Sequence, residues 1–112
     1  MRTRFSQKLE KLQARVLDGP GRLQPSARRK AFEGHSVDDA LADRYVQSIH
    51  RHAYRIVDRN IDELREAGWS EDQIFELSIS AAFGAARHRL DTALRALEAA
   101  RTSPGVPSER GA

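Results

Sequence analysis

The longest regular pattern of apolar and polar positions runs from Ser70 to Ala100, and it predicts one long helix. Apolar residues recur at helical spacing along two neighbouring stripes. The first stripe is Ile74, Leu77, Ala81, Ala85 and His88, and the second is Phe75, Ile79, Phe83 (or Ala82), Ala86, Leu90, Ala93 and Leu97. A helix with two apolar stripes is expected at the centre of a fold or between subunits.

The start of this helix carries local signals. The hydroxyl of Ser70 can accept a hydrogen bond from an amide one turn in, and Gln73 completes a capping box. Trp69 and Ile74 are placed to form a hydrophobic staple across the cap. Glu71 puts negative charge at the positive end of the helix dipole. The helix is therefore expected to begin directly after Ser70.

The run from Ser78 to Ala86 is rich in small residues and contains Gly84. A glycine inside a helix costs about 1 kcal/mol relative to alanine, so Gly84 should have a packing reason. Two interpretations stay open: plain core packing, which is the simpler one, and a close contact with a helix of another subunit. The candidates for such an oligomer interface are Ile79, Phe83, Gly84, Ala86 and Leu90.

The N-terminal third predicts two further helices. Residues 4–17 place Phe5, Leu9, Leu12 and Val16 on one helical face, with Leu17 beside it. The Gly- and Pro-rich residues 18–21 stop this helix. Pro25 and Ser26 then open a short helix over 27–33, which Gly34 closes and Phe32 is expected to anchor.

Residues 36–68 can be read as one helix over 37–67 or as two. Ser36 is the expected N-cap, and the apolar face follows Leu41, Tyr45, Ile49 (or Val46), His52 (or Ala53) and Ile56. A break at Val57–Asp58 is favoured, because Asp is common at caps and weak inside helices. Gly68 is the glycine expected to end the segment.

The fold class that follows is all-α, with about five helices and no strand, since no window alternates with period two. Residues 1–101 are expected to form a single domain. Residues 102–112 hold two prolines and two glycines without periodicity, which predicts a disordered tail.

Composition narrows the chemistry. The 112 residues include no cysteine, which excludes disulfides, thiolate metal sites and thiol redox chemistry within this chain. No apolar run approaches the roughly 20 residues of a membrane span, and the N-terminus lacks the apolar core of a signal peptide. We therefore expect a cytoplasmic protein with no membrane partner.

Charge is unevenly distributed. Residues 1–30 carry nine basic residues against two acidic ones, a net charge of +7, and the remainder carries ten against fourteen, a net charge of −4. A nucleic-acid footprint would add interleaved aromatic residues or a glycine-rich reading loop, which are missing. A solvated basic face, or a basic arm meeting the acidic part of a neighbouring subunit, is preferred.

A family resemblance rests on residues 53–97. A helix ending in Leu64–Gly68 (LREAG) is followed directly by WSEDQI and then by the small-residue helix SISAAFGAARHRLDTAL. In this order the segment resembles the carboxymuconolactone decarboxylase and AhpD-like (alkylhydroperoxidase D-like) superfamily. The resemblance implies an AhpD-like helical bundle that assembles as a homo-oligomer.

The redox members of that family carry a CxxCxxxH motif before the junction glycine. Counting back from Gly68 places Ala53 and Ile56 at the cysteine positions and Asn60 at the histidine position. A disulfide-cycling peroxidase needs a thiolate nucleophile and a resolving thiol. The thiol peroxidase activity of the family is therefore not expected here, and no cofactor is implied.

Other chemistry would have to come from the same region. A histidine with a nearby aspartate can act as an acid–base pair, and the resemblance implies that the decarboxylase branch works without a metal. The candidate catalytic residues are His50, Tyr54, Asp58 and Asn60. His52 points to a different helical face from His50, while capping explains Asp58 and packing explains Tyr54 equally well.

Metal binding is not predicted, because no His-x-x-x-His or His-Glu-x-x-His arrangement occurs. His88 is expected to be exposed or at a subunit contact.

Three hypotheses remain. The first is an oligomeric scaffold without redox cysteines that binds a partner or a small apolar ligand. The second is a cysteine-independent decarboxylase-type enzyme that acts on a small lactone or acid through His, Asp and Tyr. The third and weakest is a nucleic-acid-associated protein that uses the basic N-terminal region. Convergent His, Asp and Tyr in a pocket would favour the enzyme, and an apolar or absent pocket would favour the scaffold.

Overall fold

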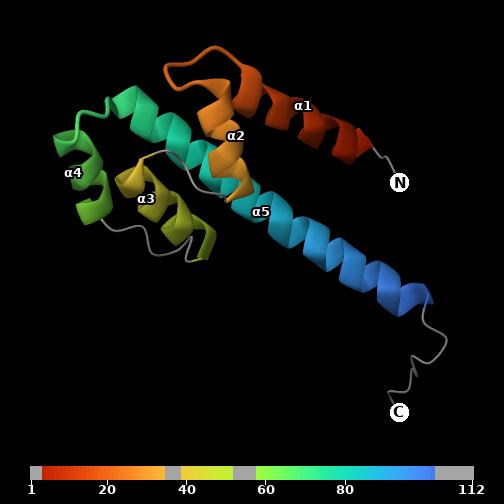
Figure 1. The fold of residues 1–112 in the computed structure, drawn as a ribbon. Coiled ribbons are helices and arrows are strands. Elements are labelled where there is room, and N and C mark those ends of the chain that lie inside the picture. The colour runs from red at the N-terminus through yellow and green to blue at the C-terminus, as the bar shows by residue number, and fades with distance from the viewer. Residues whose placement is uncertain (1–3, 35–38, 52–57, 103–112) are drawn as a thin grey trace.

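The structure, a computed structural model, describes residues 4–34, 39–51 and 58–102. These residues form five helices and no strand: α1 (Arg4–Asp18), α2 (Pro25–Glu33), α3 (Ala40–Arg51), α4 (Asp58–Glu66) and α5 (Glu71–Thr102). In Figure 1, α3 and α4 lie beside the N-terminal half of α5 and α2 crosses its middle. The C-terminal half of α5 extends away from them. The all-α prediction and the long C-terminal helix are confirmed, while the predicted tail lies outside the described residues except for Thr102, which ends α5.

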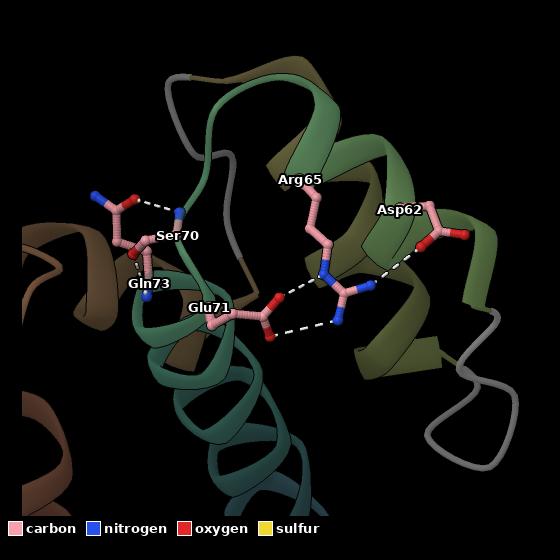
Figure 2. Close-up of polar contacts among 5 residues, drawn as sticks. All are labelled: Asp62, Arg65, Ser70, Glu71 and Gln73. Atoms are coloured by element: carbon pink, nitrogen blue, oxygen red, sulfur yellow. Dashed lines mark hydrogen bonds and ion pairs between the residues drawn. The ribbon is translucent and has the colours of Figure 1, made fainter.

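The predicted capping box at the start of α5 is present (Figure 2). The backbone N–H of Gln73 donates to Ser70 Oγ at 3.1 Å, and the Gln73 side-chain oxygen accepts from the Ser70 N–H at 3.0 Å. Each residue therefore satisfies one orphan amide of the first turn. This local signal fixes the point at which the central helix begins.

Gly68 ends α4 as expected. Its φ of 101° lies in the left-handed region that favours glycine. Its N–H donates to the Arg65 carbonyl and the Trp69 N–H donates to the Leu64 carbonyl, both at 3.0 Å. These two bonds form a Schellman motif, which satisfies the last carbonyls of the helix and turns the chain into α5.

The segment that could be read as one helix or two contains two helices in the described residues. α4 begins at Asp58, at the predicted break. Ser36, the expected cap of the first helix, lies outside the described residues. Asp39 caps α3 instead: its Oδ1 accepts from the N–H groups of Leu41 and Ala42 at 2.9 and 3.1 Å. Its Oδ2 also accepts from Trp69 Nε1 at 3.3 Å, which ties the start of α3 to the start of α5.

The core lies between α3 and the N-terminal half of α5. The first α5 stripe is buried from Ile74 to Ala85, whereas its last member, His88, is exposed. The core is completed by Leu23, Ala31, Ala42, Tyr45, Val46, Ile49 and Leu64. The first stripe is therefore the central one, and the second stripe starts at the surface, with Phe75 64% exposed.

Burial within α1 and α2 follows the apolar sequence pattern only in part. In α1, Phe5 and Leu12 are 66% and 50% exposed, and Leu17, which lies beside the predicted face, is the buried residue. In α2 the expected anchor Phe32 is half-buried, while Ala31 is fully buried. The Phe32 ring still packs against α5, where its centroid lies 6.1 Å from that of Phe83.

An interaction that the sequence did not indicate joins α1 to α2. Arg28 is only 3% exposed, and its guanidinium donates to the carbonyls of Val16, Gly19 and Leu23 at 2.8–3.0 Å. A cation at the C-terminal end of α1 complements the helix dipole. From α5, Glu76 accepts from the backbone N–H groups of Arg22 and Leu23, at 3.0 and 2.7 Å. The loop between α1 and α2 is thus held from both sides.

Candidate functional site

His50 on α3 is the predicted catalytic candidate whose surroundings the structure defines best. Its Nε2 lies 2.8 Å from the Ala31 carbonyl oxygen. A carbonyl only accepts, so Nε2 must carry the hydrogen. One turn earlier, the Gln47 side chain donates to the Gly34 carbonyl at 3.1 Å. Both side chains therefore hold α3 against the C-terminal end of α2.

A hollow of about 490 Å³ opens beside His50. It is lined by Phe32, Glu33, Gly34, His50, Gly84, Arg87, His88 and Asp91. Three elements meet there: the end of α2, the last turn of α3 and the middle of α5. The hollow places two imidazoles, two carboxylates and a guanidinium around one space, a set that sequence spacing alone did not bring together.

The polar groups of this hollow are already partly engaged. Arg87 donates from Nε to Asp91 Oδ1 at 3.3 Å and from a terminal nitrogen to Gln13 Oε1 at 2.9 Å. Asp91 is thus paired with Arg87, while His50 is bonded to a backbone carbonyl. His50 and Asp91 share the hollow but are not paired with each other as an acid–base couple would be.

The other predicted catalytic residues do not join His50. Tyr54 lies outside the described residues, and Asp58 is the first residue of α4, with a side chain that is not described. Asn60 is half-buried on α4 and does not line the hollow. Across the described residues, no group of three or more His, Cys, Asp or Glu side chains is placed to hold a metal ion.

Tyr45, which the sequence placed in the core, has a structural role. Its hydroxyl lies 2.6 Å from Ser78 Oγ, and Ser78 Oγ donates to the Ile74 carbonyl at 2.7 Å. Because a serine hydroxyl has one hydrogen, Tyr45 must be the donor in the shared bond. The phenol is therefore fixed to α5 in the core, away from the hollow at His50.

The five interface candidates take different positions. Gly84 is buried against α2 of its own chain, so close approach within the chain explains its small size. Ile79 is 38% exposed, Ala86 is exposed, and Phe83 and Leu90 are half-buried. The last three also line a small apolar hollow of about 140 Å³ against α1.

A longer groove continues from that hollow. We call it the α1–α5 groove: it lies between the N-terminal half of α1 and the C-terminal half of α5 and has a volume of about 610 Å³. Its apolar lining is Phe5, Leu9, Leu90, Leu94 and Leu97. A further hollow of about 710 Å³ lies on α1 and is lined by the basic residues Lys8, Lys11 and Arg15 with Leu12 and Asp18.

Shifted pKa values mark a different place, the joint between α4 and α5 (Figure 2). Arg65 Nε lies 2.6 Å from Glu71 Oε2, and a terminal nitrogen lies 3.1 Å from Asp62 Oδ1. The hydrogen bond and the positive charge of Arg65 lower the pKa of Glu71, and Glu71 in turn raises the pKa of Arg65. These groups clamp α4 to α5. Because they are exposed to solvent, their shifted pKa values do not indicate a catalytic pocket.

No helix in the described part of the chain combines the length and the apolar character that a membrane crossing requires. Comparison with known proteins gives no match to a family model, to a curated protein or to a solved structure.

Proposed function

We propose that this protein is an AhpD-like helical scaffold without redox cysteines, which works as a homo-oligomer and binds a partner or a small apolar ligand. The observation that carries the proposal is the unpartnered apolar surface along α5 and α1. Phe5, Leu94 and Leu97 are each more than half exposed and line one groove. Contiguous apolar surface of this kind marks an interaction site on a folded chain.

The polar hollow supports binding more than turnover. The Nε2–H of His50 already donates to the Ala31 carbonyl, and the Asp91 carboxylate is paired with Arg87. The resemblance in residues 53–97 and the absence of cysteine support a family member without thiol chemistry. We propose the cytoplasm as its location.

The experiment is a measurement of molar mass in solution. We expect the molar mass of the chain at micromolar concentration to be a multiple of 12.6 kDa. A single species of 12.6 kDa would remove the oligomeric scaffold.

One observation favours a second candidate, a cysteine-independent decarboxylase-type enzyme. The hollow is lined by His50 of α3 together with His88 and Asp91 of α5. Turnover of a small lactone or β-keto acid, followed by NMR and lost in His50→Gln but kept in His52→Gln, would establish it. A third candidate, nucleic-acid association, would use the basic hollow on α1 and would appear as salt-sensitive binding.

A further inference from the structure

The C-terminal half of α5 extends beyond the core of its own chain. The buried residues of α5 end at Ala85, and from Ala86 to Thr102, all of which the structure describes, none is buried. That stretch is roughly 25 Å of helix at 1.5 Å per residue. An isolated helix of this length is marginal in water, so it needs another surface to pack against.

α1 leaves a matching surface uncovered. It is buried at Leu17 near its C-terminal end, whereas Phe5 near its N-terminal end is 66% exposed. Figure 1 shows that the N-terminal end of α1 and the C-terminal end of α5 extend toward the same side of the molecule. The α1–α5 groove between them is lined by apolar residues of both helices and by charged residues of α5.

The spacing on α5 suits a helix as the occupant. Phe83, Ala86, Leu90, Ala93, Leu97 and Ala100 follow the alternating three- and four-residue steps of a coiled-coil seam. Large residues alternate with alanines along this seam. When two such seams run antiparallel, a large residue of one faces a small residue of the other, which fills the contact without voids.

The charges along the groove indicate which helix can occupy it. Along the groove, Arg87, Asp91, Arg95, Glu98 and Arg101 alternate in sign. A rim that carries both signs in alternation can face its own copy without concentrating like charges. The outer face of α1, with Lys8, Lys11 and Arg15, would repel a second copy of itself.

We infer that a second copy of this chain fills the groove: two chains pair about a twofold axis, and the C-terminal half of α5 of each lies in the α1–α5 groove of the other. Such an interface is isologous, because each chain is both host and guest, so it closes at two chains. The inference rests on the proposed function. It places the interface nearer the C-terminus than the candidates between Ile79 and Leu90, at Leu94 and Leu97.

The test uses the full chain and compares Leu94→Glu/Leu97→Glu with Phe75→Glu, which places a charge at an equally exposed position outside the groove. Light scattering should give twice 12.6 kDa for the wild type and for Phe75→Glu, and 12.6 kDa for the double variant. Circular dichroism should show that the double variant keeps most of its helix.

The outcomes separate the two proposals. A monomeric wild type overturns the oligomeric function together with this inference. If the wild type is oligomeric and the double variant has the same molar mass, the groove is not the interface. The same conclusion follows if Phe75→Glu dissociates as the double variant does.

A second measurement does not depend on the folding of the double variant. The chain lacks cysteine, so Ala93→Cys introduces a single thiol on the seam. A short bismaleimide should cross-link it to a covalent dimer, whereas Glu66→Cys, exposed on α4, should stay single. Equal cross-linking of both variants would contradict the groove as the interface.

Discussion

Gly84 of α5 lies directly against the backbone of Phe32 in α2. A β-carbon placed on Gly84 would come within 1.8 Å of the Phe32 carbonyl oxygen and within 2.5 Å of its carbonyl carbon. Because the neighbour is backbone at the end of a helix, it cannot rotate away as a side chain would. Beside this contact the rings of Phe32 and Phe83 stack at a tilt, with centroids 6.1 Å apart.

Replacing Gly84 should therefore separate α2 from α5. We expect Gly84→Leu to lower the free energy of unfolding by about 3 kcal/mol or more, beyond the usual cost of overpacking. Ala82→Leu adds a similar volume at an exposed position of the same helix and should be nearly neutral. Urea denaturation measures both, and equal stability of the two variants would show that α2 can move aside.

The buried guanidinium of Arg28 should be costly to remove. It supplies three hydrogen bonds to the carbonyls of Val16, Gly19 and Leu23, and buried acceptors without partners are penalised. We expect Arg28→Met to lose on the order of 3 kcal/mol. Arg29→Met, which removes an exposed pair with Asp18, should lose under about 1 kcal/mol. Thermal melts that rank the two variants the other way would contradict this role.

The clamp between Arg65 and Glu71 should make stability depend on pH in the acidic range. Since the folded state lowers the pKa of Glu71, its contribution is present above the ordinary glutamate pKa and is lost as pH falls through the lowered value. Wild type should therefore lose more stability than Glu71→Gln between neutral pH and pH about 3. Identical slopes for the two proteins would show that the clamp adds nothing, and high salt should weaken the difference.

The purified protein should not turn over hydroperoxides. The chain contains no cysteine, so it can form neither the thiolate nor the disulfide that a thiol peroxidase cycle requires. An assay with an organic hydroperoxide and a dithiol reductant checks this, and metal-free turnover linear in protein would contradict it.

Local signals in the sequence predict the structure correctly where their partners lie within a few residues. Ser70 with Gln73, and the glycines at 34 and 68, depend on hydrogen bonds inside a single turn of chain. The burial of Arg28 was not visible in the sequence, where it forms part of a basic run, because its three acceptors lie 5–12 residues away on the preceding loop and helix.

The candidate site was predicted only in part for the same reason. His50 was identified from its region, but the residues that share its hollow come from α2 and α5, and helical spacing within one segment does not reveal them. The apolar spacing of α1 correctly predicted a helix over 4–17. The spacing does not show that Phe5 and Leu12 remain exposed, because the surface that covers an apolar helix face can belong to a second molecule.

The molar mass of the wild-type chain, measured by light scattering over a series of micromolar concentrations, tests whether the apolar surface of α1 and α5 serves self-association. We expect a species of twice 12.6 kDa throughout the series, with dissociation only at lower concentrations. A mass of 12.6 kDa at every concentration would mean that this surface does not serve self-association, and would contradict the proposed dimer.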